Sequence, residues 1–320
     1  MSIKRFAIVA AMLLTASGFA YGAKTTVDDW QNTAVNQRNR LPMTATLKTD
    51  SPCISLDGVW NFEWFENADQ RTTDFYKVDS RFGTNDDYRN LSAKLHDNGI
   101  KLVMDMVFNH CGSHNFIYKD LPDSSWIHCW PEFTRSNYRG TTCFDPHASQ
   151  YDKNLMLNGW FDTTMPDLNQ GNYMLMTYLI QNSIWWTEYL GLDAIRMDTY
   201  PYNDKDAMRR WCDALHEEFP GMSLLGEVWL NDNPFVSYFA HGMRNLDGYS
   251  SGLDHVTDFP LTFALNKAFQ EQEGWDTGMA RLYQHFVSDY LIPDAGKNVI
   301  FADNHDLSRI ATTMGGDISK

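Results

Sequence analysis

The stretch Gly191-Leu-Asp-Ala-Ile-Arg-Met-Asp198 decides the fold class of this 320-residue chain. It is typical of a buried strand that ends in a carboxylate, and it follows a long helical pattern over 173–189. A helix followed by a short apolar strand is the repeating unit of a parallel sheet flanked by helices. The stretch therefore predicts an α/β fold.

The same unit recurs on both sides of this stretch. The pattern predicts strands at 101–108, 191–198, 223–227, 255–261 and 298–303, and helices at 88–98, 173–189, 204–218 and 262–272. Gly99 follows the first of these helices, at the position where a glycine ends a helix. Residues of about 111–170 interrupt the alternation and are rich in aromatic residues and Asp, which predicts an inserted loop subdomain.

Polar residues gather where the predicted strands end. They are Asp105, His110, Arg196, Asp198, Glu227, Asp303, His305 and Asp306. In an α/β barrel, catalytic groups lie at the C-terminal ends of the strands. Glycoside hydrolysis needs one ionised carboxylate and one protonated acid, and Asp198 and Glu227 suit these two roles. Arg196 lies two residues before Asp198, so both side chains should share a face of the strand, where the guanidinium favours an ionised Asp198.

Four segments together resemble the ordered sequence regions of glycoside hydrolase family 13, the α-amylase superfamily. They are Asp105-Met-Val-Phe-Asn-His110, Gly191-Leu-Asp-Ala-Ile-Arg-Met-Asp198, Gly226-Glu-Val-Trp229 and Phe301-Ala-Asp-Asn-His-Asp306. The resemblance implies a retaining α-glucan hydrolase with Asp198 as nucleophile, Glu227 as acid/base and Asp306 as transition-state stabiliser. It also implies that His110 and His305 bind sugar hydroxyls, that Arg196 orients Asp198, and that Asp105 supports Arg196.

A fifth segment, Met165-Pro-Asp-Leu-Asn169, is similar to that of the neopullulanase and cyclomaltodextrinase subgroup, although its Pro-Asp-Leu-Asn part also occurs in oligo-1,6-glucosidases. Thr199-Tyr-Pro-Tyr202 stands where plain α-amylases have a Lys-His pair. The resemblance therefore implies action on α-1,4 glucans such as starch, pullulan or maltodextrin, with α-1,6 linkages as an open alternative. No cofactor is required, but calcium is an open alternative because Asn109 matches a frequent Ca²⁺ ligand of the family.

The resemblance covers only about 75–320 and matches the third to the seventh strand of an eight-stranded barrel. We therefore expect a partial (β/α)8 TIM barrel that lacks the first two strands and the eighth. The segment 23–74 is expected to be β-rich, with a hairpin over 54–64, and it resembles the start of a glycoside hydrolase family 2 β-galactosidase through 29–35, 39–43 and 55–64. These matches predict a chimaera joined within 73–79, whose two open sheet edges should make folding marginal and activity weak or absent.

The first 22 residues predict a secretory signal, with Lys4 and Arg5 before a short apolar run over 6–14 and small residues at Ala20 and Gly22. The chain is therefore expected to be exported, to the periplasm or the medium. A formal charge of −15 and the lack of a basic stripe argue against nucleic-acid binding, and no later segment suggests a membrane span. Five cysteines allow up to two disulfides. The oligomeric state cannot be inferred from the sequence.

Three functional classes remain open. The first is an enzyme that acts on α-glucans, and the second is an inactive fusion product that at most binds glucan. The third is an inactive amylase-like partner protein, which the complete acid set disfavours. The His and Cys residues over 110–129 do not have the spacing of a closed zinc site.

Overall fold

The computed structural model describes residues 74–315. The expected signal at 1–22, the β-rich segment before residue 74 and its hairpin lie outside the described residues. Within 74–315, no helix has both the length and the apolarity to cross a bilayer.

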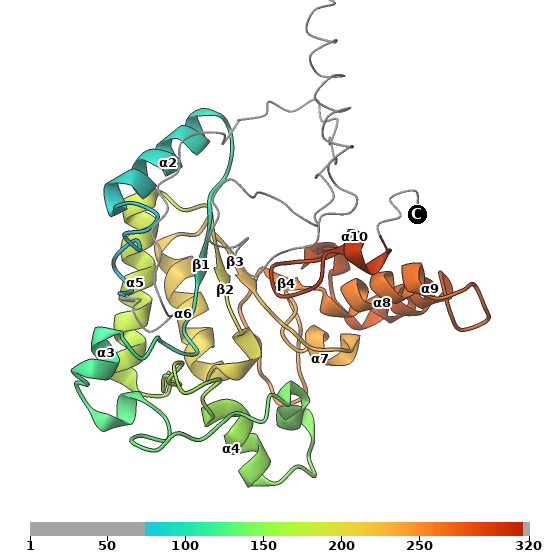
Figure 1. Cartoon of the computed structure of the whole chain (residues 1–320), viewed down its shortest axis with the longest axis horizontal. Helices are drawn as coiled ribbons and strands as arrows, with labels where there is room; N and C mark the ends of the chain where they lie inside the picture. The colour runs from blue at the N-terminus through green and yellow to red at the C-terminus, as the bar shows by residue number, and fades with distance from the viewer. Residues whose placement is uncertain (1–73, 316–320) are drawn as a thin grey trace, which may run out of the picture. The chain divides into compact units, whose positions relative to one another are not determined.

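A five-stranded parallel sheet forms the centre of the described chain, with its strands in the order β1-β2-β3-β4-β5 (Figure 1). The strands are β1 (Val103–Met106), β2 (Ala194–Met197), β3 (Ser223–Gly226), β4 (His255–Thr257) and β5 (Asn298–Val299). Sequential parallel strands joined through helices confirm the prediction of a partial (β/α)8 barrel.

The α-helices of the described chain are α2 (Asn85–Asp97), α3 (Phe116–Lys119), α4 (Gln150–Asn158), α5 (Tyr173–Leu190), α6 (Lys205–Glu218), α7 (Asn233–Ser237), α8 (Phe259–Gln270), α9 (Ala280–Val287) and α10 (Ile310–Thr313). Short 3-10 turns occur at η3 (Ser124–Trp126), η4 (Gly140–Phe144), η5 (Tyr200–Tyr202), η6 (Ser288–Leu291) and η7 (Ala295–Lys297). Figure 1 shows α5 and α6 beside β1, β2 and β3, with α8 and α9 toward the β4 side.

Helix termini follow the local sequence. Gly99 (φ 71°) and Gly191 (φ 65°) take the left-handed conformation just after α2 and α5, which glycine adopts without the steric penalty of a side chain. Asp204 caps α6 by accepting a hydrogen bond from the Ala207 amide at 2.7 Å. These stop and start signals place the three helices within a few residues of their predicted bounds.

All five predicted strands are longer than those observed, and the last two have clear local reasons. The strand expected at 255–261 ends at Thr257, because Asp258 caps α8 through the Leu261 amide and Pro260 occupies its first turn. The strand expected at 298–303 is only Asn298–Val299. Asp303 belongs instead to a turn, where its carboxylate accepts from Arg309 and from the Ile310 amide.

Large apolar side chains fill the space between the sheet and helices α5 and α6. Ile195 of β2, Leu224 of β3, Trp186 of α5 and Trp211 of α6 are at most 2% exposed. The Trp211 indole donates to Ser183 Oγ at 2.9 Å, which joins α6 to α5. This packed layer fixes the positions of β2 and β3 relative to each other, and therefore the positions of the residues at their ends.

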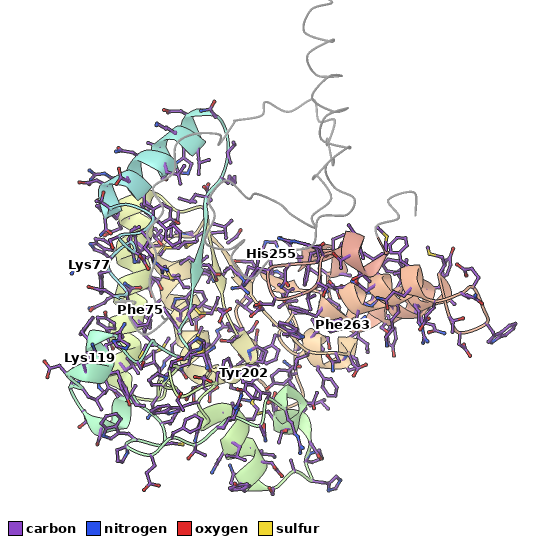
Figure 2. The ribbon with its side chains drawn as sticks, in the orientation of Figure 1. Phe75, Lys77, Lys119, Tyr202, His255 and Phe263 are labelled. Carbon is purple, nitrogen blue, oxygen red and sulfur yellow. The ribbon has the colours of Figure 1, made fainter. Side chains whose placement is uncertain are left out.

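The chain at 74–79, where the predicted junction lies, packs against α5. The Phe75 carbonyl accepts hydrogen bonds from Asn182 and from the Trp186 indole, and Phe75 lies beside α5 in Figure 2. The Asn85 side chain of α2 donates to the Tyr76 carbonyl. The first described residues are thus part of the helical layer.

Residues 111–170 hold α3, η3, η4 and α4, with no strand of the main sheet. The two ends of the segment lie close together in space. His110 pairs with Asp167, and Ile127 pairs with Leu168, in isolated bridges. In Figure 1 it lies at the end of the sheet to which the strands lead. It therefore faces the C-terminal strand ends.

Candidate active site

Arg196 is the centre of the polar cluster at the C-terminal ends of the strands. Its Nη1 donates to Asp105 Oδ1 at 2.6 Å and to Asp198 Oδ1 at 3.0 Å. Its Nη2 donates to Glu227 Oε1 at 2.5 Å. One guanidinium thus connects three carboxylates from three adjacent strands, and the two-residue spacing of Arg196 and Asp198 puts both on one face as predicted.

The register of the sheet brings Asp105 to Arg196. These two residues are direct partners across β1 and β2. The side chain of Asp105 is 53% exposed, whereas that of Arg196 is 16% exposed. Asp105 therefore supports Arg196 from the solvent side, in the place that the resemblance implied.

Glu227 follows β3 directly and is only 3% exposed. Its Oε2 accepts from the Thr199 amide at 2.9 Å, while Oε1 accepts from Arg196. Burial raises the pKa of Glu227, against the lowering effects of the Thr199 amide hydrogen bond and the Arg196 charge, and the nearby charges of Asp198 and Asp306 raise it further. A carboxyl with a raised pKa suits the role of a general acid.

His110, Asp198 and Glu227 line one cavity of about 1180 Å³ together with His305 and Asp306. Burial lowers the pKa of His110, with Asp198 opposing the shift, so His110 favours the neutral imidazole. His305 and Asp306 lie at the exposed rim, with side chains 67% and 42% exposed. The structure brings every predicted catalytic residue to one cavity.

Aromatic side chains that the sequence analysis did not assign to the site also line this cavity. They are Tyr138, Phe161, Tyr202 and Trp229. Tyr202 and Trp229 could have been found, since they follow Asp198 and Glu227 by four and two residues. Figure 2 shows Tyr202 between the strand ends and the segment that carries α4. Tyr138 and Phe161 come from the inserted segment, where no sequence pattern indicated them.

The aromatic patch of Trp185, Trp186 and Tyr189 lies elsewhere, on α5. Trp185 stacks on Tyr189 with ring centroids 4.9 Å apart, and Trp186 is 2% exposed. None of the three lines the cavity of Asp198. They belong to helix packing.

Asn109, the predicted calcium ligand, is buried beside Asp167. Neither amide atom of Asn109 has a hydrogen-bond partner among the described residues. His128 Nδ1 binds Asp167 Oδ2 at 2.7 Å and so takes one of the two carboxylate oxygens. Calcium takes about six to eight oxygen ligands, and no cluster of three or more His, Cys, Asp or Glu residues suited to a metal occurs within 74–315. Calcium ligation by Asn109 therefore stays a prediction.

Four cysteines fall in the described chain, and all are free thiols: Cys111, Cys129, Cys143 and Cys212. No two of these four form a disulfide. Cys53 lies before the described residues, so its pairing is open.

Comparison with known proteins agrees with this geometry. The family model described as "Alpha amylase, catalytic domain" matches residues 54–320. The match begins at residue 54, inside the segment 23–74, so the boundary near residue 74 stays a prediction.

Relatives and solved structures point the same way. The chain is 25% identical over 262 residues to a cyclomaltodextrinase from Geobacillus thermopakistaniensis, covering 78% of this chain and 39% of that one. It is 26% identical over 289 residues to alpha-amylase 3 of Dictyoglomus thermophilum, covering 83% and 52%. It is also similar to the crystal structure of the alpha-amylase from Geobacillus thermoleovorans complexed with acarbose, with a TM-score of 0.62, 26% identity and coverage of 76% and 49%. The chain thus spans about half or less of these proteins, and through its catalytic domain it belongs to the alpha-amylase family, glycoside hydrolase family 13.

Proposed function

We propose that this chain hydrolyses α-glucans by double displacement, with retention at the anomeric carbon. The observation that carries the proposal is the single guanidinium of Arg196, which binds Asp198 and Glu227 at one cavity. It orients two carboxyls with different surroundings, and glycosidases need such a pair.

In the first step, a carboxylate oxygen of Asp198 attacks the anomeric carbon. Arg196 holds Oδ1, so we assign the attack to Oδ2. The glycosidic bond breaks, and Glu227 gives its proton to the leaving oxygen. In the second step, Glu227 takes a proton from water, whose oxygen attacks the same carbon and releases Asp198.

Asp306, His305 and His110 are assigned to the bound sugar. All three line the cavity. A carboxylate at Asp306 stabilises the positive charge that develops on the sugar ring in the transition state. His110 and His305 bind sugar hydroxyls, and His110 favours the neutral imidazole, which both donates and accepts.

The substrate class is an α-1,4 glucan, with α-1,6 linkages as a further possibility. The names of two relatives, a cyclomaltodextrinase and an alpha-amylase, support an α-glucan. We further propose that the protein is exported and that hydrolysis needs no metal. Equal initial rates in calcium and in a chelator would support the second point, and a loss of rate in the chelator would contradict it.

The test incubates the 320-residue chain with maltodextrin, cyclomaltodextrin and pullulan and follows the first product by ¹H NMR. The α-anomer should appear first, and Asp198→Asn should abolish its release. The β-anomer as first product would contradict retention.

Binding without cleavage is the second candidate, and the exposure of His305 and Asp306 at the cavity rim favours it. Calorimetric titration with maltodextrin separates the two candidates. Heat of binding with no product after long incubation would support the second candidate and overturn the first.

A further inference from the structure

The turn after the proposed nucleophile has an unusual backbone. Thr199 lies at φ 45° and ψ 39°, in the left-handed region. A β-branched residue rarely adopts this conformation, because its side chain crowds the backbone there. Such strain persists only where surrounding contacts hold the residue in place.

This conformation directs main-chain donors at Glu227. The Thr199 amide donates to Glu227 Oε2 at 2.9 Å, and the Tyr200 amide donates to the Glu227 carbonyl at 3.0 Å. Arg196 binds the other carboxyl oxygen. Both carboxyl oxygens of Glu227 therefore accept hydrogen bonds, and one of these bonds comes from the Thr199 turn.

The Asn203 side chain binds the carbonyls of the same turn, on the side away from the active cavity. Its Nδ2 donates to the Thr199 carbonyl at 3.1 Å and to the Tyr200 carbonyl at 3.3 Å. Asn203 is 2% exposed. It lines a second cavity of about 610 Å³ rather than the cavity of Asp198 and Glu227, whereas Thr199 lines the latter. Asn203 therefore does not contact a substrate in the active cavity.

We propose that Asn203 is a positioning residue, which holds the strained Thr199 turn so that the Thr199 amide fixes the carboxyl of Glu227. The inference rests on the proposed function, in which Glu227 is the acid/base. The amide hydrogen bond favours the charged carboxylate. Loosening the turn should therefore raise the pKa of Glu227 and also let its carboxyl rotate.

The test compares the pH dependence of kcat/KM in the whole chain and in Asn203→Leu, which keeps the branching of the side chain but removes both Nδ2 hydrogen bonds. We expect kcat to fall about 10-fold, KM to stay the same, and the basic limb to move up by roughly 0.5 pH unit. Asn203→Ser, a milder change that keeps a hydroxyl donor, should give a smaller shift, and it serves if the leucine variant does not fold.

Asn233→Leu is the matched control. Asn233 is also buried, donates to a backbone carbonyl (His285) and has a side-chain oxygen without a partner in the described chain. It does not line the active cavity. A lower Tm with an unmoved basic limb in both Asn203 and Asn233 variants would overturn the proposal, because Asn203 would then be merely structural.

A readout independent of activity separates this inference from the proposed function. Titration of the Glu227 carboxyl by ¹³C NMR, assigned by its absence in Glu227→Gln, gives its pKa directly. If the chain cleaves no glucan, the proposed function fails, yet a raised Glu227 pKa in Asn203→Leu still supports the positioning role. An unchanged pKa overturns it.

Discussion

Arg196 Nη2 lies 2.5 Å from Glu227 Oε1, so the proposed acid is bound by the same guanidinium that holds the proposed nucleophile. This contact opposes the burial that raises the pKa of Glu227. The working protonation of Glu227 is thus a balance between desolvation and two hydrogen bonds.

Arg196→Lys should upset this balance. One ammonium cannot reproduce the fork that reaches Asp105 and Asp198 from Nη1 and Glu227 from Nη2. We expect kcat/KM to fall by about 10²-fold or more and its basic limb to move to higher pH, measured with maltodextrin. Arg281→Lys is the control, because Arg281 forks onto Glu271 away from the cavity. An unchanged pH profile in Arg196→Lys would contradict the balance.

Glu227→Gln should separate the two carboxyl roles. Without an acid, the first step fails when the leaving group is a sugar hydroxyl but proceeds when the leaving group is an acidic phenol. The rate of maltodextrin cleavage should therefore fall by about 10³-fold. The rate of the first-turnover burst of nitrophenol from a nitrophenyl α-maltoside should fall much less. Asp198→Asn should be inactive on both substrates. Equal losses on both substrates for Glu227→Gln would refute its role as the acid.

Gly226→Ala should disturb the site through packing. A Cβ at Gly226 would lie 2.5 Å from Leu253 Cδ1 and 3.1 Å from the Tyr200 ring. We expect a loss of about 1–3 kcal/mol in unfolding free energy and a fall in kcat, because Glu227 is the next residue. Gly221→Ala, whose Cβ would meet nothing within 4 Å, is the control. Urea unfolding of both variants checks this, and equal stabilities would show the prediction to be wrong.

Asp167→Asn should change how stability depends on pH. Burial raises the pKa of Asp167 to about 7, despite its hydrogen bond with His128. Between about pH 4 and 7 the folded state therefore binds more protons at this group than the unfolded state, so its contribution to stability falls as pH rises. The variant lacks this term, so its free energy of unfolding should rise relative to the wild type by on the order of 4 kcal/mol across that window.

Unfolding midpoints of Asp167→Asn measured at several pH values check this sign. Asp213→Asn, on the exposed face of α6, controls for removing a negative charge. Parallel curves for the wild type and Asp167→Asn would count against the buried, protonated form.

The last strand shows where sequence reasoning reached its limit. The octet ending at Asp198 predicted β2, and Asp303 was counted among the strand-end acids. In the structure Asp303 is bound by Arg309 and the Ile310 amide, because the strand ends at Val299 and the chain turns. The local pattern predicted β5 but not its length. That length depends on how far the chain pairs with β4, its neighbour in the described sheet.

The sequence by itself determined the repeating βα order and the polar residues that stand at the strand ends. Residues at strand ends are ordered along the chain, and parallel strands bring their C-terminal ends to one edge, so Asp105, Arg196, Asp198 and Glu227 had to meet. Only the tertiary structure decided how they meet. The fork of Arg196, the left-handed Thr199 and the His128–Asp167 pair depend on contacts between residues far apart in the chain, and such contacts follow from packing rather than from local periodicity.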